Sequence, residues 1–190
     1  MTSTLRTASN ILCLAAILAA LHGCAPLTAT GAAVSGDRRS TGTVFDDEQI
    51  ESKAHDFFNA DQELVQACHI NATSYNQQVL LSGECPTDQL RQKAAEYTKR
   101  VGKVRNIFNE IALAAPSTLT ARSADGLITT KVRAKLLTIN DLPGSNIKVV
   151  TEAGVVFMMG LVDEASGNAA AEAAATVGGV AKVVKLFEHP

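Results

Sequence analysis

Hydrophobic and polar residues recur in the same order in two stretches of this chain. In residues 147–160 (IKVVTEAGVVFMMG) two β-branched runs flank Ala153-Gly154, and residues 70–83 (INATSYNQQVLLSG) repeat the pattern at one constant offset. Short apolar runs on either side of a turn predict a β-hairpin. A hairpin of the same length that occurs twice predicts a repeated small domain.

The segments around each hairpin repeat as well. Residues 90–101 place apolar side chains on one helical face, and residues 165–177 form an alanine-rich helical run after the second hairpin. Closely spaced apolar residues close each copy, at 102–111 and 178–187, and one more helical pattern precedes each hairpin. Each copy is therefore predicted to have the order helix, strand, strand, helix, strand.

Composition fits two small globular domains. The net charge is −2, and the chain is 46% hydrophobic but only 4% aromatic, which suggests a modest aliphatic core. Domains of roughly 70 residues are marginally stable alone, so we expect the two copies to pack together. A net charge near zero argues against a nucleic-acid-binding protein, which would usually be strongly basic.

The N-terminal residues have the pattern of an export signal. Arg6 precedes the apolar run 11–21, which is too short to span a bilayer comfortably. Residues 21–24 (LHGC) resemble the lipobox of bacterial lipoproteins, although His22 departs from its usual small residue. That resemblance implies removal of residues 1–23, and diacylglycerol plus an N-acyl chain such as palmitate on Cys24. The alanine that follows favours the outer membrane. The alternative is a plain signal peptide with a chance cysteine.

Two stretches show no periodic pattern. Residues 24–45 are rich in Gly, Ser, Thr and Ala and predict a flexible tether. Residues 115–124 hold Pro116 and small polar residues and predict the linker between the copies. The two domains are then assigned to residues 46–114 and 125–190.

Two cysteines lie beside the first hairpin. If Asn76-Gln77 is its turn, Cys68 lies opposite Cys85 across the strands. In an oxidising compartment such a pair is predicted to form a disulfide. Two free thiols are the first alternative. A metal site made by Cys68, His69 and Cys85 is a poorer one, because adjacent residues on a strand point to opposite faces.

The first helices of the two copies differ in charge. Residues 46–63 hold seven acids and one lysine, which predicts a strongly negative face. The acids at 46–48 are expected to cap that helix, as Asp125 is expected to cap the helix over 126–139. No acid occurs in the second helix after Asp125.

The helix over 126–139 is predicted to present two faces. Its core stripe comprises Ile128, Val132, Leu136 and Ile139. The other side is partly apolar and edged by cations: Leu127, Thr130, Lys131, Arg133, Ala134 and Leu137. Such a face can lie on an anionic membrane. The alternative is that its leucines pack against the other copy while the cations only solvate the helix.

The repeated pattern resembles the BON domain. The motifs SYNQQVLLSG, VRNIFNEI, GLITTKVRAKLL and NIKVVTEAGVVFMMGLV, with the lipobox, resemble dual-BON outer-membrane lipoproteins (the DolP/YraP type). The resemblance covers the chain from about Cys24 onward. It implies an α+β fold of two tandem BON domains, each α-β-β-α-β with a small three-stranded sheet covered by two helices.

The resemblance also implies a function. It predicts a lipid-anchored protein on the periplasmic face of the outer membrane that binds anionic phospholipid, supports envelope integrity and is enriched at cell division sites. In that family the first helix of the second domain contacts lipid, which assigns phospholipid binding to Leu127, Thr130, Lys131, Arg133, Ala134 and Leu137. Family members can carry an aromatic residue where Leu127 stands, so insertion here is expected to be shallower.

A protein-interaction adaptor for an envelope assembly or division factor is the alternative function. An enzyme is not expected, because the chain has no HExxH, GxSxG or P-loop motif and no carboxylate cluster beside a histidine. For the same reasons we expect no metal site, no cofactor other than the lipid on Cys24, and no nucleic-acid partner.

Overall fold

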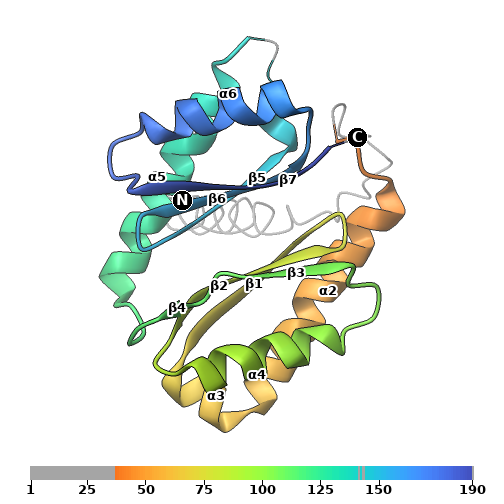
Figure 1. The fold of residues 1–190 in the computed structure, drawn as a ribbon, viewed down its shortest axis with the longest axis vertical. Coiled ribbons are helices and arrows are strands. Elements are labelled where there is room, and N and C mark those ends of the chain that lie inside the picture. The colour runs from red at the N-terminus through yellow and green to blue at the C-terminus, as the bar shows by residue number, and fades with distance from the viewer. Residues whose placement is uncertain (1–36, 141, 143, 190) are drawn as a thin grey trace, which may run out of the picture. The chain divides into compact units, whose positions relative to one another are not determined.

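The computed structural model describes residues 37–140, 142 and 144–189 (Figure 1). The predicted signal peptide, the lipid attachment at Cys24 and most of the predicted tether lie outside these residues. The first repeat contains α2 (Thr41–Ala60), α3 (Gln62–Ala67), β1 (His69–Tyr75), β2 (Gln78–Cys85), α4 (Asp88–Lys99), β3 (Asn106–Asn109) and β4 (Ala112–Leu113). The second contains α5 (Leu119–Leu137), η2 (Gly144–Asn146), β5 (Ile147–Glu152), β6 (Val155–Leu161), α6 (Glu164–Ala175) and β7 (Lys182–Glu188).

Each repeat forms one small mixed sheet with a central strand. β2 pairs antiparallel with β1 and parallel with β3 and β4, and β6 pairs antiparallel with β5 and parallel with β7. Both hairpins have the predicted register. Their turns have positive φ at both central residues, 52° and 64° at Asn76-Gln77 and 49° and 73° at Ala153-Gly154. This is the type I′ geometry that suits the twist of two-residue hairpins. The predicted α+β class is confirmed.

Helices cover one face of each sheet, and the other faces of the two sheets pack together. One core lies under α2 and α4, and another lies under α5 and α6. A third joins the sheets through Tyr75 and Leu80 of the first repeat and Phe157 and Met159 of the second. Figure 1 shows the sheets facing each other between α6 and α4. The central strands are therefore buried on both faces, which explains their continuous rather than alternating apolar runs.

The first helices begin earlier than predicted. Ser40 caps α2 by accepting the backbone N–H of Thr43 at 3.1 Å, and Thr118 caps α5 by accepting that of Ala121 at 3.2 Å. The end of the predicted tether and the second half of the predicted linker are consequently helical. These first turns are mostly exposed, so they carry no apolar period that would indicate a helix.

Asp47 and Asp125 do not cap helices, contrary to prediction, but bind the hairpin turns. The backbone N–H groups of Gln77 and Asn76 donate to Asp47 at 2.7 and 2.8 Å, and those of Ala153 and Gly154 donate to Asp125 at 3.0 and 2.9 Å. Both carboxylates are buried. They occupy equivalent positions in the repeat, and we call each arrangement an aspartate clasp. It satisfies turn N–H groups that would otherwise lack partners.

The predicted negative face of the first helix is largely neutralised. Five of its acids form ion pairs: Asp46 with Lys103, Asp47 with Arg39, Glu51 with Lys148, and both Asp61 and Glu63 with Lys93. The exposed acids left on the outer side of α2 are Glu48 and Asp56. The sequence count therefore overstated the charge that this helix presents.

Cys68 and Cys85 are joined by a disulfide, with their Cα atoms 4.5 Å apart. The bond links the residue before β1 to the last residue of β2, in the register that the hairpin sets. It restricts the unfolded chain and thereby favours the folded state.

Candidate functional site

The outer face of α5 carries three of the seven large hydrophobic side chains that are exposed in the part of the chain that the structure describes. The inner stripe of this helix, which includes Val132 and Leu136, is fully buried against the second sheet and α6. Three leucines project on the opposite side, with exposed fractions of 76% for Leu119, 63% for Leu127 and 68% for Leu137. With 3.6 residues per turn, these positions and the small side chains between them lie on one side of the helix.

All six residues assigned to phospholipid binding are exposed: Leu127, Thr130, Lys131, Arg133, Ala134 and Leu137. The alternative in which Leu127 and Leu137 pack against the first repeat is wrong, because both remain exposed while the sheets make the contact between repeats. Sequence reasoning missed Leu119, which it placed in the linker. The signal that could have found it is Thr118, an N-cap residue shortly after Pro116.

Cations edge the outer face of α5 on both sides. Lys131 and Lys135 lie along one edge, and Arg122 and Arg133 lie along the other. Within the described ranges none of these four forms an ion pair, although Arg133 donates to the carbonyl of Val149 at 2.9 Å. The one acid in α5 is Asp125, which its clasp keeps buried. The exposed side of the helix therefore carries positive charge without a compensating carboxylate.

A shallow cleft runs beside the arginine edge of α5. It measures about 400 Å³ and is lined by residues that include Arg122, Arg133, His69 and Glu152. The guanidinium of Arg122 lies 3.1 Å from Nδ1 of His69, so the cleft joins α5 to the start of β1. Cationic groups in a cleft next to an apolar helical face can receive the phosphate of a lipid headgroup.

Two carboxylates between the sheets have opposite pKa shifts. Burial raises the pKa of Glu152, although Asn71 donates to it at 2.7 Å. Burial also opposes ionisation of Glu188, but hydrogen bonds from Arg105, Asn76 and Gln78 outweigh it and lower the pKa of that group. Glu188 is thus stabilised as an anion in the folded chain, whereas Glu152 is destabilised.

We expect Glu152→Gln to stabilise the folded chain at pH 7. Because the folded pKa of Glu152 lies above its ordinary value of 4.5, the charged form is less favourable in the folded than in the unfolded state. This penalty is absent below about pH 4.5 and grows as the pH rises through the folded pKa. Glutamine keeps an oxygen for Asn71 and Ser82 but carries no charge. Urea midpoints of variant and wild type should coincide near pH 4 and separate at pH 7. Equal midpoints at both pH values would contradict this.

The described residues contain no group of three or more His, Cys, Asp or Glu side chains placed to hold a metal ion. None of the described helices is long and apolar enough to cross a bilayer.

Comparison with known proteins gives consistent results. The BON domain family matches residues 46–115 and again 124–188. The chain is 34% identical over 173 residues to outer membrane lipoprotein DolP of Haemophilus influenzae, covering 89% of this chain and 90% of the relative. It is 36% identical over 153 residues to a 21 kDa hemolysin of Actinobacillus pleuropneumoniae, covering 80% and 79%. It is 26% identical over 156 residues to osmotically-inducible protein Y of Escherichia coli, covering 80% and 77%.

Proposed function

Because this chain belongs to the BON-domain family, as a dual-BON protein of the DolP type, we propose that it is an outer-membrane lipoprotein that binds anionic phospholipid. The outer face of α5 makes the contact, while acyl chains on Cys24 hold the protein at the periplasmic side of the membrane. Its role is non-enzymatic support of envelope integrity. The observation that carries the proposal is a helix with three exposed leucines, edge cations and no exposed acid.

The binding energy comes from two sources. Leucines that move from water into the boundary between headgroups and acyl chains gain in proportion to the apolar area they bury. Lys131 and Arg133 add roughly 1 kcal/mol each near an anionic surface. Because the inner stripe of α5 is fixed on its sheet, the outer face is held ready and little conformational entropy is lost on binding.

The equivalent helix of the first repeat lacks this combination. α2 exposes Phe45, at 59%, but Glu48 follows one turn later, and Asp56 is exposed further along. These carboxylates would be repelled by an anionic bilayer. The two helices occupy the same place in the repeat, and their difference in charge supports α5 rather than α2 as the lipid-binding helix.

The direct test is co-sedimentation with lipid vesicles. A chain starting at Ala25 keeps the whole compact unit Gly36–Pro190 and lacks the acyl chains that would bind any bilayer. We expect it to sediment with vesicles containing phosphatidylglycerol and to be released as salt is raised. It should stay in solution with vesicles of phosphatidylcholine alone. Equal binding to both, or none to either, would contradict the proposal.

The leucines should contribute independently of charge. We expect Leu127→Ser/Leu137→Ser to weaken binding to anionic vesicles by about 2 kcal/mol, or roughly thirtyfold, because each exposed leucine loses a favourable transfer from water. Val65→Ser/Leu113→Ser is the matched control, since those side chains are 55% and 56% exposed on other elements. A similar loss in the control would show that the effect is not specific to α5.

A further inference from the structure

Strand β7 is unusually open for an apolar strand. None of its seven residues is buried, whereas five of the seven in its neighbour β6 are. It nonetheless carries Val183, Val184, Leu186 and Phe187, all only partly buried. Among the strands of the described residues, β7 is the last of its sheet and pairs only with β6. An exposed edge strand of this kind is a template for pairing with another strand.

Side chains form hydrogen bonds with the backbone of β1, an edge strand of the first sheet, and of β5, the other edge strand of the second sheet. At β1, Glu51 accepts the N–H of Ser74 at 2.8 Å and Lys148 donates to its carbonyl at 3.2 Å. At β5, Arg133 donates to the carbonyl of Val149. In the described part of the chain no side chain bonds the backbone of β7, whose contacts are with β6 and its continuation at Val162. Within the described residues, one edge of this sheet therefore has a side-chain hydrogen bond to its backbone and the other has none.

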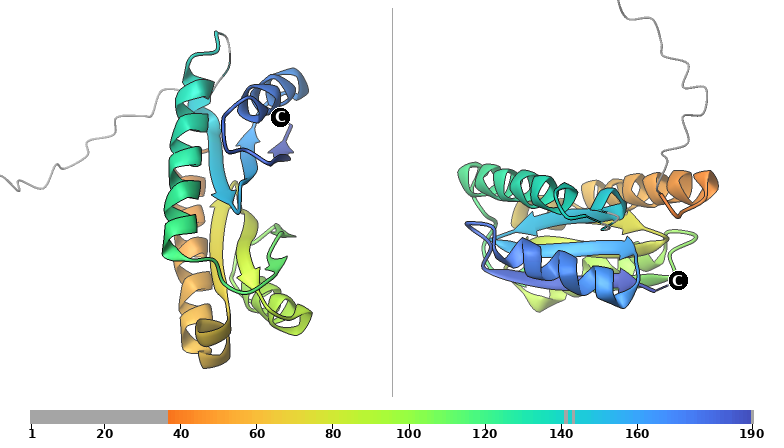
Figure 2. Two further views of the ribbon diagram at one scale, coloured as in Figure 1. Left: turned by 90° about the vertical axis from the view of Figure 1, so that its left-hand side faces the viewer. Right: turned by 90° about the horizontal axis from the view of Figure 1, so that it is seen from above.

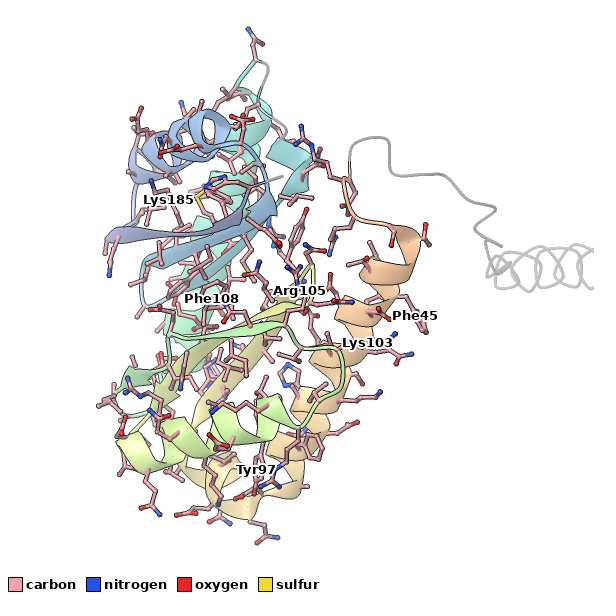
Figure 3. All side chains as sticks on the ribbon, turned by 45° about the vertical axis from the view of Figure 1, so that its right-hand side comes forward. Phe45, Tyr97, Lys103, Arg105, Phe108 and Lys185 are labelled. Carbon is pink, nitrogen blue, oxygen red and sulfur yellow. A yellow bond between two sulfur atoms is a disulfide. The ribbon has the colours of Figure 1, made fainter. Side chains whose placement is uncertain are left out.

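On each face of the sheet, next to β7, there is a place where a side chain of an added strand could bind. Toward α6, a pocket of about 220 Å³ is lined by residues that include Gly167, Lys185 and Phe187. On the other side, Phe108 of β3 and Leu186 are partly buried between the sheets. Figure 3 shows Phe108 between the sheets and Lys185 on the α6 side of β7. Because side chains alternate along a strand, one added to β7 would place them in these two sites in turn.

Charge determines what kind of strand fits. Lys182 and Lys185 are exposed, and the partner of Lys185 is the neutral Asn168, at 2.7 Å. Glu188, the one acid of β7, already accepts hydrogen bonds from Asn76, Gln78 and Arg105. An added strand that carries acidic residues would be attracted to the two exposed lysines. The charges along β7 therefore favour an acidic partner segment.

We infer that β7 is a docking edge for an extended, acidic segment of a partner protein. The segment adds a strand to the second sheet through backbone hydrogen bonds. Its acids lie near Lys182 and Lys185, and an apolar side chain contacts Phe108 and Leu186. This mode of recognition takes affinity from the backbone and specificity from the pockets. Figure 2 (left) shows α5 and β7 on opposite sides of the strands, so a molecule bound to lipid through α5 leaves β7 accessible.

The test uses a short synthetic valine peptide with two glutamates three residues apart, added to the chain starting at Ala25. At this spacing the two glutamates point to opposite faces of a strand, as Lys182 and Lys185 do. Binding should slow hydrogen exchange of amides in β7, since pairing protects them. Lys182→Glu/Lys185→Glu should weaken binding at least about tenfold. Lys53→Glu/Lys99→Glu is the control with the same change in net charge, on exposed positions of α2 and α4, and should leave binding unchanged.

Two further peptides make the test decisive. Methylating alternate backbone nitrogens of the peptide keeps its charges but removes its strand hydrogen bonds, and should abolish binding. Replacing its glutamates by lysines should do the same through repulsion. Absence of binding by the original peptide, undiminished binding of the methylated one, or self-association of the chain through β7 would each overturn the inference.

Discussion

Asp47→Ala is expected to lower the free energy of unfolding by about 3–5 kcal/mol, because it leaves a buried hydroxyl and two turn N–H groups without their acceptor and removes one of the two carboxylates that pair with Arg39. The carboxylate pairs with Arg39 at 2.8 Å, and their side chains are only 3% and 12% exposed. It also accepts the hydroxyl of Ser74 at 2.6 Å and two turn N–H groups. A domain of this kind has only about 5–15 kcal/mol of stability, so the loss should be evident in urea unfolding.

Two matched variants show what Asp47 contributes. Asp125→Ala removes the equivalent clasp but breaks no ion pair and no hydroxyl bond like that of Ser74, so its expected loss is smaller, about 1–3 kcal/mol. Asp56→Ala removes an exposed acid from the same helix and should change stability by less than about 0.5 kcal/mol. If Asp47→Ala proves no more destabilising than Asp56→Ala, the clasp does not hold the first repeat together.

Lys131→Glu/Arg133→Glu is expected to weaken binding to anionic vesicles by about 4 kcal/mol at low salt, since two attractions of roughly 1 kcal/mol each become repulsions. This corresponds to roughly a thousandfold in affinity. The difference should shrink as added salt screens the surface charge. Co-sedimentation over a range of lipid and salt concentrations measures both effects.

The control for this variant is Lys182→Glu/Lys185→Glu, which makes the same change in net charge on β7. It should retain most of the vesicle affinity, because both lysines belong to β7, which lies on the other side of the strands from α5 (Figure 2). Arg133 also bonds the carbonyl of Val149, so urea midpoints should verify that the α5 variant remains folded. Equal losses in the two variants would mean that only total charge matters, and that α5 is not the binding element.

Local patterns predicted much of this fold. The two hairpins, their turns and their register follow from short apolar runs around turn residues, and pairing across such a turn is a local interaction. The inner stripe of α5 could likewise be predicted, because helical spacing alone determines that Val132 and Leu136 share a face. The leucines opposite them were predicted as a separate face for the same reason.

Features that depend on distant contacts could not be predicted. The turn residues that donate to Asp47 and Asp125 lie roughly 30 positions away along the chain. For this reason the two aspartates were predicted to cap helices instead. The acids of α2 pair with lysines of other elements, which a count along the chain cannot show. The first turns of α2 and α5 are exposed, so their sequence shows no helical spacing of apolar residues and the start of each helix could not be predicted. Open and closed sheet edges also emerge only when side chains such as Glu51 and Arg133 are placed.

The most direct test of lipid binding by α5 is its depth in the bilayer. A fluorescent label on Leu127→Cys, with Glu172→Cys on the exposed side of α6 as the control position, would be exposed to vesicles carrying a nitroxide quencher below the headgroups. Our account predicts quenching at position 127 with anionic vesicles only, reversed by salt, and none at position 172. Equal quenching at the two positions, or none at 127 while the protein is bound, would contradict it.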